Sequence, residues 1–242
     1  MKIARYQKIL VALLFLQTLA AAQSKTPDTT KTTGKAKVLE QTKTQEQPKT
    51  PAQTKTTAQV KVQAAQVNNF VQRFDDKFLI NLALTRNESE TKKMLFASNS
   101  VIYVSYTLPA ALFAGGMIRH DGAMRQNALY VGSSTAIDLG VTLLLKTIFK
   151  RRRPFVQNLK IVAVYNEGST SFPSGHTSTS FAVATSLSRA YPKWYIILPS
   201  YLWAGSVGYS RMYLGVHYPS DVVGGALLGT AAAWETKRAF KN

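Results

Sequence analysis

The chain contains no cysteine and little negative charge. The absence of cysteine excludes disulfides, zinc–thiolate sites and a thiol nucleophile. Only 12 Asp and Glu stand against 30 Lys and Arg, which gives a formal net charge of +18. The few acids form no cluster that would hold two catalytic metal ions, so we expect neither a metal nor another cofactor. A basic chain suits an anionic partner. Since no nucleic-acid-binding motif is present, an anionic membrane or an anionic substrate is favoured.

The N-terminal part of the chain, residues 1–66, is not expected to belong to a folded domain. Basic residues precede the apolar run 9–16, and the alanines at 20–22 follow it as an Ala-x-Ala cleavage site. Residues 1–22 are therefore a secretory signal peptide or an uncleaved membrane anchor, and in both cases the chain is exported or inserted. Residues 23–66 are mostly Lys, Thr, Gln, Ala and Pro. Because they contain too few apolar side chains to offset the entropy of ordering, we expect a disordered basic linker.

Residues 67–242 are expected to form one all-α domain. It opens with apolar residues that recur every four positions, as in an amphipathic helix: Phe70, Phe74, Phe78 and Leu82. This helix lies at a membrane interface or covers a soluble core. Five apolar runs follow, at residues 98–118, 128–149, 176–188, 194–208 and 222–234.

These runs predict a transmembrane bundle of about five to six helices. The first two have about the length that spans a bilayer. The second contains one acid, Asp138, which has either a functional role, as is usual for an acid inside a membrane, or a purely structural hydrogen-bonding role. The third run is rich in Ser and Thr and is too short to span roughly 30 Å of hydrocarbon. Its shortness leaves a soluble helical bundle open. The fifth run consists mostly of small residues that let membrane helices pack closely.

The distribution of basic loops gives the expected orientation. If the linker is outside, the basic segments 119–125, 189–193 and 237–241 all lie inside, as the positive-inside rule requires. The basic segment 150–153 lies outside and breaks the rule. We therefore expect a multi-pass protein of the inner (cytoplasmic) membrane, with this segment facing the periplasm or exterior.

Three polar motifs stand at the predicted outer ends of the helices. They read Lys-x6-Arg-Pro, Pro-Ser-Gly-His and Ser-Arg-x5-His-x3-Asp, and they begin at Lys146, Pro173 and Ser210. In this order, the motifs resemble the three signatures of the type 2 phosphatidic acid phosphatase superfamily. The resemblance covers the five apolar runs, which look like those of its membrane lipid-phosphatase branch. The family also contains soluble periplasmic acid phosphatases and vanadium haloperoxidases.

The resemblance and the residue types together imply three catalytic residues. His217 is the candidate nucleophile, which would form a phosphohistidine. Asp221 would accept a hydrogen bond from the His217 ring, orient the ring and support its positive charge. His176 would protonate the leaving oxygen and later activate water.

A second set of residues would bind the substrate phosphate. Arg153 and Arg211 can form two-pronged bonds to its oxygens, and Lys146 adds a point charge. Ser174, a candidate N-cap, and the N–H of Gly175 stand at a helix start, which favours anions. The neighbouring cations Lys150, Arg151 and Arg152 can steer an anionic headgroup, so Arg151→Ala is expected to be mild.

The sequence thus predicts metal-independent hydrolysis of a lipid phosphate monoester or diphosphate at the outer face of the inner membrane. Candidate substrates are phosphatidylglycerol phosphate, phosphatidate, polyprenyl diphosphate and phosphorylated lipid A. The alternatives are a soluble periplasmic acid phosphatase with the same site and a non-enzymatic membrane protein that binds anionic glycolipid. The expected partners are the lipid substrate and the membrane, with no nucleic acid.

Overall fold

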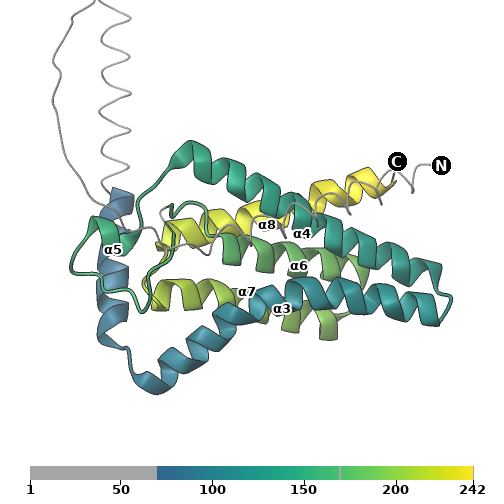
Figure 1. The fold of residues 1–242 in the computed structure, drawn as a ribbon, viewed down its shortest axis with the longest axis horizontal. Helices are drawn as coiled ribbons and strands as arrows, with labels where there is room; N and C mark the ends of the chain where they lie inside the picture. The colour runs from purple at the N-terminus through teal and green to yellow at the C-terminus, as the bar shows by residue number, and fades with distance from the viewer. Residues whose placement is uncertain (1–69, 169, 242) are drawn as a thin grey trace, which may run out of the picture. The chain divides into compact units, whose positions relative to one another are not determined.

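The computed structural model describes residues 70–168 and 170–241, whose arrangement is seen in Figure 1. The predicted signal peptide (1–22) and linker (23–66) lie outside these residues. The described residues are mostly helical and contain no β-strand, which confirms the predicted all-α fold. The helices are a segment at 70–84, α3 (Glu88–Ile118), α4 (Gly122–Phe149), α5 (Pro154–Gln157), α6 (Gly175–Ala190), α7 (Trp194–Tyr213) and α8 (Pro219–Lys241).

Side-chain caps set where the two longest helices begin. The Asn87 side chain accepts the Glu90 N–H at 2.9 Å at the start of α3, and Asp121 accepts the Met124 N–H at 3.0 Å at the start of α4. Because of the Asn87 cap, α3 begins well before the apolar run that predicted it. The other end of α4 is marked by Lys150, whose left-handed backbone (φ 45°) stops the helix.

The short third run forms α6, which is enclosed by other helices. It packs against α4, α7 and α8 (Figure 1). Its hydroxyl residues Ser178, Ser180 and Thr185 are buried, and hydroxyls of this kind can bond to protein groups instead of water. The helix α8 approaches so closely that a Cβ atom on Gly225 would lie 2.6 Å from the Ser174 carbonyl oxygen. Because α6 is enclosed by other helices, it can be short and carry many hydroxyl side chains.

Two of the described helices, α3 and α4, are long and apolar enough to cross a membrane. Large apolar side chains are also exposed on α4, α7 and α8, where Leu144, Leu202 and Leu227 are each more than half exposed. Such a surface suits contact with lipid better than contact with water. That the other three runs also cross the membrane stays a prediction.

Only part of the predicted apolar stripe of the helix at 70–84 faces the core. Phe70 and Phe74 are exposed, whereas Phe78 packs against a small buried cluster of Leu79, Ile161 and Tyr218. The first half of the stripe is therefore not on the core-facing side of this helix. Exposed phenylalanines favour the membrane-interface alternative over the soluble-core alternative.

Candidate active site

The first motif lies where α4 ends and α5 begins. Arg153 is buried at the N-cap position of α5 and donates to the Val216 carbonyl oxygen at 2.9 Å. Its Nη1 atom is also 3.2 Å from Nε2 of His217. Lys146, in the last turn of α4, donates to the Thr170 carbonyl oxygen at 3.0 Å. The motif thus places one of its two cations directly against the candidate nucleophile.

The second motif begins α6. Ser174 stands at the predicted N-cap position, and Gly175 is the first helical residue. The Ser174 side chain does not cap the helix, because its hydroxyl pairs with the Thr177 hydroxyl at 2.9 Å. Its backbone N–H donates to the Asp221 carbonyl oxygen at 3.1 Å. This bond ties the start of α6 to the start of α8.

The third motif runs from the end of α7 to the start of α8. Arg211 is completely buried in the last turn of α7, where it donates to the Ser98 hydroxyl at 2.5 Å and to the Tyr165 hydroxyl. Gly215 then reverses the chain with φ 74°, a conformation that favours glycine. This turn brings the His217 N–H to 3.3 Å from the Arg211 carbonyl oxygen.

His217 and Asp221 lie side by side, but without the direct hydrogen bond that the sequence predicted. The Asp221 Oδ2 atom lies 3.6 Å from His217 Nδ1, and both side chains are buried. This oxygen also accepts the Ser171 hydroxyl and, at 3.0 Å, the Tyr218 N–H. At 3.6 Å the carboxylate acts on the ring mainly through its charge, since the distance is too long for a hydrogen bond.

Burial and the surrounding charges keep the His217 ring neutral. Burial is the largest influence and lowers its pKa, and the positive charges of Arg211 and Arg153 act in the same direction. Asp221 opposes them, and the resulting pKa is about 4. A neutral ring at pH 7 has the free lone pair that a nucleophile needs.

Glu167 is a member of the site that the sequence analysis missed. Its Oε2 atom accepts from Arg153 Nη1 at 2.9 Å and from Arg211 Nη2. The same carboxylate lies 3.9 Å from His176 Nδ1 and 4.0 Å from His217 Nε2. The four predicted side chains therefore converge on one carboxylate.

The two arginines determine the charge of Glu167. Burial would raise its pKa, but Arg211 and Arg153 outweigh burial and hold the pKa below its ordinary value. In the sequence, Glu167 is the single acid between Arg153 and Asp221. This isolation among several cations that are predicted to bind phosphate was the feature of the sequence that could have identified Glu167 as a site residue.

Arg151 corrects one expectation from the sequence. We expected a headgroup-steering cation, but its guanidinium binds Asp221 Oδ1 at 2.7 Å and Asp75 Oδ2 at 2.9 Å. The prediction that its loss is mild is therefore wrong in its premise.

Asp138 is fully buried. It accepts from the Ser178 hydroxyl and, at 3.1 Å, from the Thr179 hydroxyl, and these bonds join α4 to α6. These bonds support the hydrogen-bonding role for Asp138.

Among the described residues, no group of three or more His, Cys, Asp or Glu side chains is placed to hold a metal ion.

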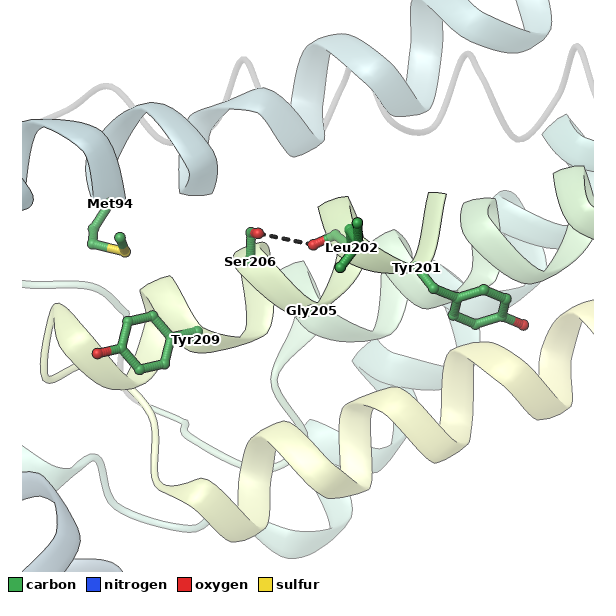
Figure 2. A pocket seen from close by; sticks show the side chains of 6 residues that line it. All are labelled: Met94, Tyr201, Leu202, Gly205, Ser206 and Tyr209. Atoms are coloured by element: carbon green, nitrogen blue, oxygen red, sulfur yellow. Dashed lines mark hydrogen bonds between the residues drawn. The ribbon is translucent and has the colours of Figure 1, made fainter. Parts of the chain in front are cut away.

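A hollow between α3 and α7 lies apart from the motif residues, none of which lines it (Figure 2). One of its members, Ser206, donates to the Leu202 carbonyl oxygen at 2.8 Å and so satisfies its own hydroxyl. The hollow offers apolar and tyrosine side chains but no acid or base for catalysis. Its lining residues are Met94, Tyr201, Leu202, Gly205, Ser206 and Tyr209.

Comparison with known proteins gives consistent results. Residues 127–242 match the family described as the PAP2 superfamily. The chain is 37% identical over 81 residues to a lipid A 4'-phosphatase of Bacteroides thetaiotaomicron, covering 34% of this chain and 36% of the relative. It is 31% identical over 100 residues to the undecaprenyl-diphosphatase BcrC of Bacillus subtilis, covering 41% of this chain and 51% of the relative. The matches thus span about half or less of these relatives.

A solved structure is similar over a greater length. It is the transmembrane PAP2 type phosphatidylglycerolphosphate phosphatase of Bacillus subtilis, with a TM-score of 0.61 and 27% identity. The match covers 74% of this chain and 90% of that one.

Proposed function

Because the chain carries a PAP2 superfamily domain of the membrane lipid-phosphatase branch, we propose that it hydrolyses lipid phosphate monoesters or diphosphates. The observation that carries this proposal is the position of the Glu167 carboxylate. Arg153 and Arg211 grip this anion while the two histidines stand about 4 Å away. A phosphate group that replaced the carboxylate would have the same two cations on its oxygens and both histidines within about 4 Å.

The first half of the proposed reaction transfers the phosphoryl group to His217. Arg153 donates toward Nε2, which fits the tautomer with its proton on Nδ1, beside Asp221, and the lone pair on Nε2. Attack by Nε2 forms the N–P bond while the bond from phosphorus to the leaving oxygen breaks. Burial and the charge of Arg211 lower the pKa of His176 in the free site, so this ring takes up its proton when the phosphate anion binds beside it. It then gives that proton to the leaving oxygen.

The second half releases phosphate. Neutral His176 takes a proton from water, and the resulting hydroxide attacks phosphorus. The N–P bond then breaks, its electron pair returns to Nε2, and His176 is protonated again for the next cycle. Both arginines stabilise the charge on the equatorial oxygens in each step, which is where most of the catalysis in phosphoryl transfer arises.

The helix order supports placing the site at one membrane face. Its helical residues come from the last turns of α4 and α7 and the first turns of α6 and α8, and Arg153, Glu167 and His217 lie in the segments that connect these helices. If successive helices alternate in direction across the bilayer, these four ends share one side. With the orientation expected from the basic loops, that side is the outer face of the inner membrane.

The test is phosphate release from a panel of lipid phosphates by the full chain purified in detergent. The panel contains phosphatidylglycerol phosphate, phosphatidate, polyprenyl diphosphate and phosphorylated lipid A, with His217→Asn as the inactive control. We expect turnover of at least one substrate, unchanged by excess chelator and inhibited by vanadate. Turnover that disappears with chelator and returns with magnesium would overturn the mechanism. Headgroup binding without turnover would favour the glycolipid-binding alternative, and activity in the supernatant of detergent-free membranes would favour the soluble phosphatase.

A further inference from the structure

We propose that Arg151 and Asp75, which lie outside the three motifs, are positioning residues that fix the Asp221 carboxylate relative to His217. This inference rests on the proposed function. It assigns a role in the reaction to the helix at 70–84, which the motifs do not include.

Arg151 joins that helix to the catalytic acid. Its Nη1 atom donates at 2.7 Å both to Asp221 Oδ1 and to the Ser220 hydroxyl, and its Nη2 atom donates at 2.9 Å to Asp75 Oδ2. Its guanidinium carbon lies 4.1 Å from the centre of the Tyr218 ring, a cation–π distance. Both terminal nitrogens of the guanidinium thus bond to groups at the start of α8 or on the 70–84 helix.

Asp75 is held as firmly as Arg151. It is 1% exposed, and its Oδ1 atom accepts the Ser220 N–H at 3.1 Å while Oδ2 accepts the Ser220 hydroxyl. A buried carboxylate requires such partners, because removal of its charge from water is costly unless it is paired and hydrogen-bonded. Asp75 therefore fixes Arg151 and also the first turn of the helix that carries Asp221.

The consequence concerns the two oxygens of Asp221. Arg151 occupies Oδ1, and this leaves Oδ2 directed toward His217 Nδ1 at 3.6 Å. The terminal torsion of an aspartate has broad preferences, so the side chain alone would not maintain this division. With Arg151 absent, Oδ1 loses its charged partner, and the remaining bonds to the carboxylate in the described structure are those from the Ser171 hydroxyl and the Tyr218 N–H to Oδ2. These two bonds alone hold the carboxylate less firmly against His217 than the full set does.

The neighbouring residue provides a contrast. Arg152 is exposed, as expected of a cation that steers an anionic headgroup. Arg151 is mostly covered, with a side chain 23% exposed, and it is paired with two carboxylates. An Arg152→Met variant is therefore a matched control for Arg151→Met.

The first experiment compares these two variants as full chains in detergent. We expect Arg151→Met to lower kcat about 10- to 100-fold, the usual effect of removing a group that orients a catalytic ligand, with KM nearly unchanged. Arg151→Lys should recover part of the loss, and Arg152→Met should resemble the parent. An increase in KM at unchanged kcat would show that Arg151 steers substrate and would overturn the proposal.

The second experiment measures the His217 pKa by nuclear magnetic resonance titration of its ring, which does not depend on turnover. The charged groups facing this ring are Arg153, Arg211, Glu167, His176 and Asp221, with Arg151 behind Asp221. Removal of the Arg151 charge should raise the pKa. Asp75→Asn removes a negative charge, so it should lower kcat without raising the pKa.

The two variants should thus differ in their effect on the His217 pKa. This difference separates a loss of positioning from a general loosening of the fold. A loosened site would raise the His217 pKa in both variants, and that result would overturn the proposal. Asp76→Asn is the control for Asp75→Asn, because its amide oxygen can still accept from Gln72 as Asp76 does at 2.9 Å. If the parent hydrolyses no lipid phosphate, the proposed function fails. The titration still decides the inference, and Arg151→Gln, which also removes the charge, replaces Arg151→Met if the latter does not fold.

Discussion

Replacement of Glu167 by glutamine should tighten the binding of phosphate and vanadate. The carboxylate of Glu167 occupies the space between Arg153 and Arg211, so an incoming phosphate must displace it. Glutamine has nearly the same size and can still accept one hydrogen bond, but it carries no charge. The substitution therefore weakens the side chain that competes with phosphate for the two arginines, while a side chain of nearly the same size still fills the site.

The magnitude follows from the two bonds that Glu167 accepts. A hydrogen bond to a charged group contributes about 1.5–3 kcal/mol to stability, and bonds in which a partner is ionised are roughly twice as strong as neutral ones. Loss of the carboxylate charge at both arginines should therefore weaken the competitor by about 1.5–3 kcal/mol in total. At 1.4 kcal/mol for each factor of ten, the inhibition constants of vanadate and phosphate should fall about 10- to 100-fold.

The assay is steady-state hydrolysis of a lipid phosphate with increasing orthovanadate or inorganic phosphate. Glu88→Gln is the matched control, because Glu88 is exposed on α3 and pairs only with a surface lysine in the described structure, Lys92. Stronger product inhibition in Glu167→Gln would also appear as early slowing of the reaction. If vanadate inhibits Glu167→Gln less than the parent, Glu167 maintains the arginines in position, and the displacement argument is refuted.

Four further predictions concern the same site and its support. Arg211→Lys keeps the charge but loses the two-pronged geometry, so turnover should fall at least about tenfold, and parental turnover would place the phosphate elsewhere. General acid catalysis is worth about 10²- to 10⁴-fold. His176→Asn should therefore reduce phosphatidate hydrolysis far more than nitrophenyl phosphate hydrolysis, and equal losses without a burst would contradict its role. Because the pKa of His217 is lowered to about 4, its neutral form persists below pH 6.5. The acidic limb of kcat/KM should then lie well below that of an ordinary histidine, and a limb near 6.5 would exclude a depressed pKa. Gly229→Leu would push a side chain into the α6 backbone at Ser178, so thermal unfolding should show a loss of several kcal/mol, about the upper range for single substitutions.

The sequence predicted the parts of the site that lie at helix ends. Lys146, His176 and Arg211 each belong to an apolar run or its edge, and alternating helices bring such ends together. The five runs also fall within α3, α4, α6, α7 and α8. Local periodicity and motif spacing contain this information, because helical geometry converts sequence distance directly into spatial distance.

The contacts that the sequence did not predict join distant segments. Asp75 and Ser220 are 145 positions apart, and no periodic pattern indicates that they bond. Glu167 lies between α5 and α6, outside a regular helix, so no register placed its carboxylate between two arginines. The aromatic stripe of the helix at 70–84 predicted the core contact of Phe78 but not the exposure of Phe70 and Phe74. A surface that faces lipid is as apolar as a core, and hydrophobicity alone does not separate the two.

The close approach of α8 to α6 has a consequence for how this protein can vary. The Ser174 N–H bonds to the Asp221 carbonyl oxygen, and Gly225 leaves no side chain between the two helices there. The distance between the turn predicted to bind phosphate and the start of the helix that carries Asp221 is thus set by contacts between the two backbones. The outward-facing leucines of α4, α7 and α8 take no part in that spacing. Their replacement by other apolar residues should therefore leave the spacing between these two helix starts unchanged.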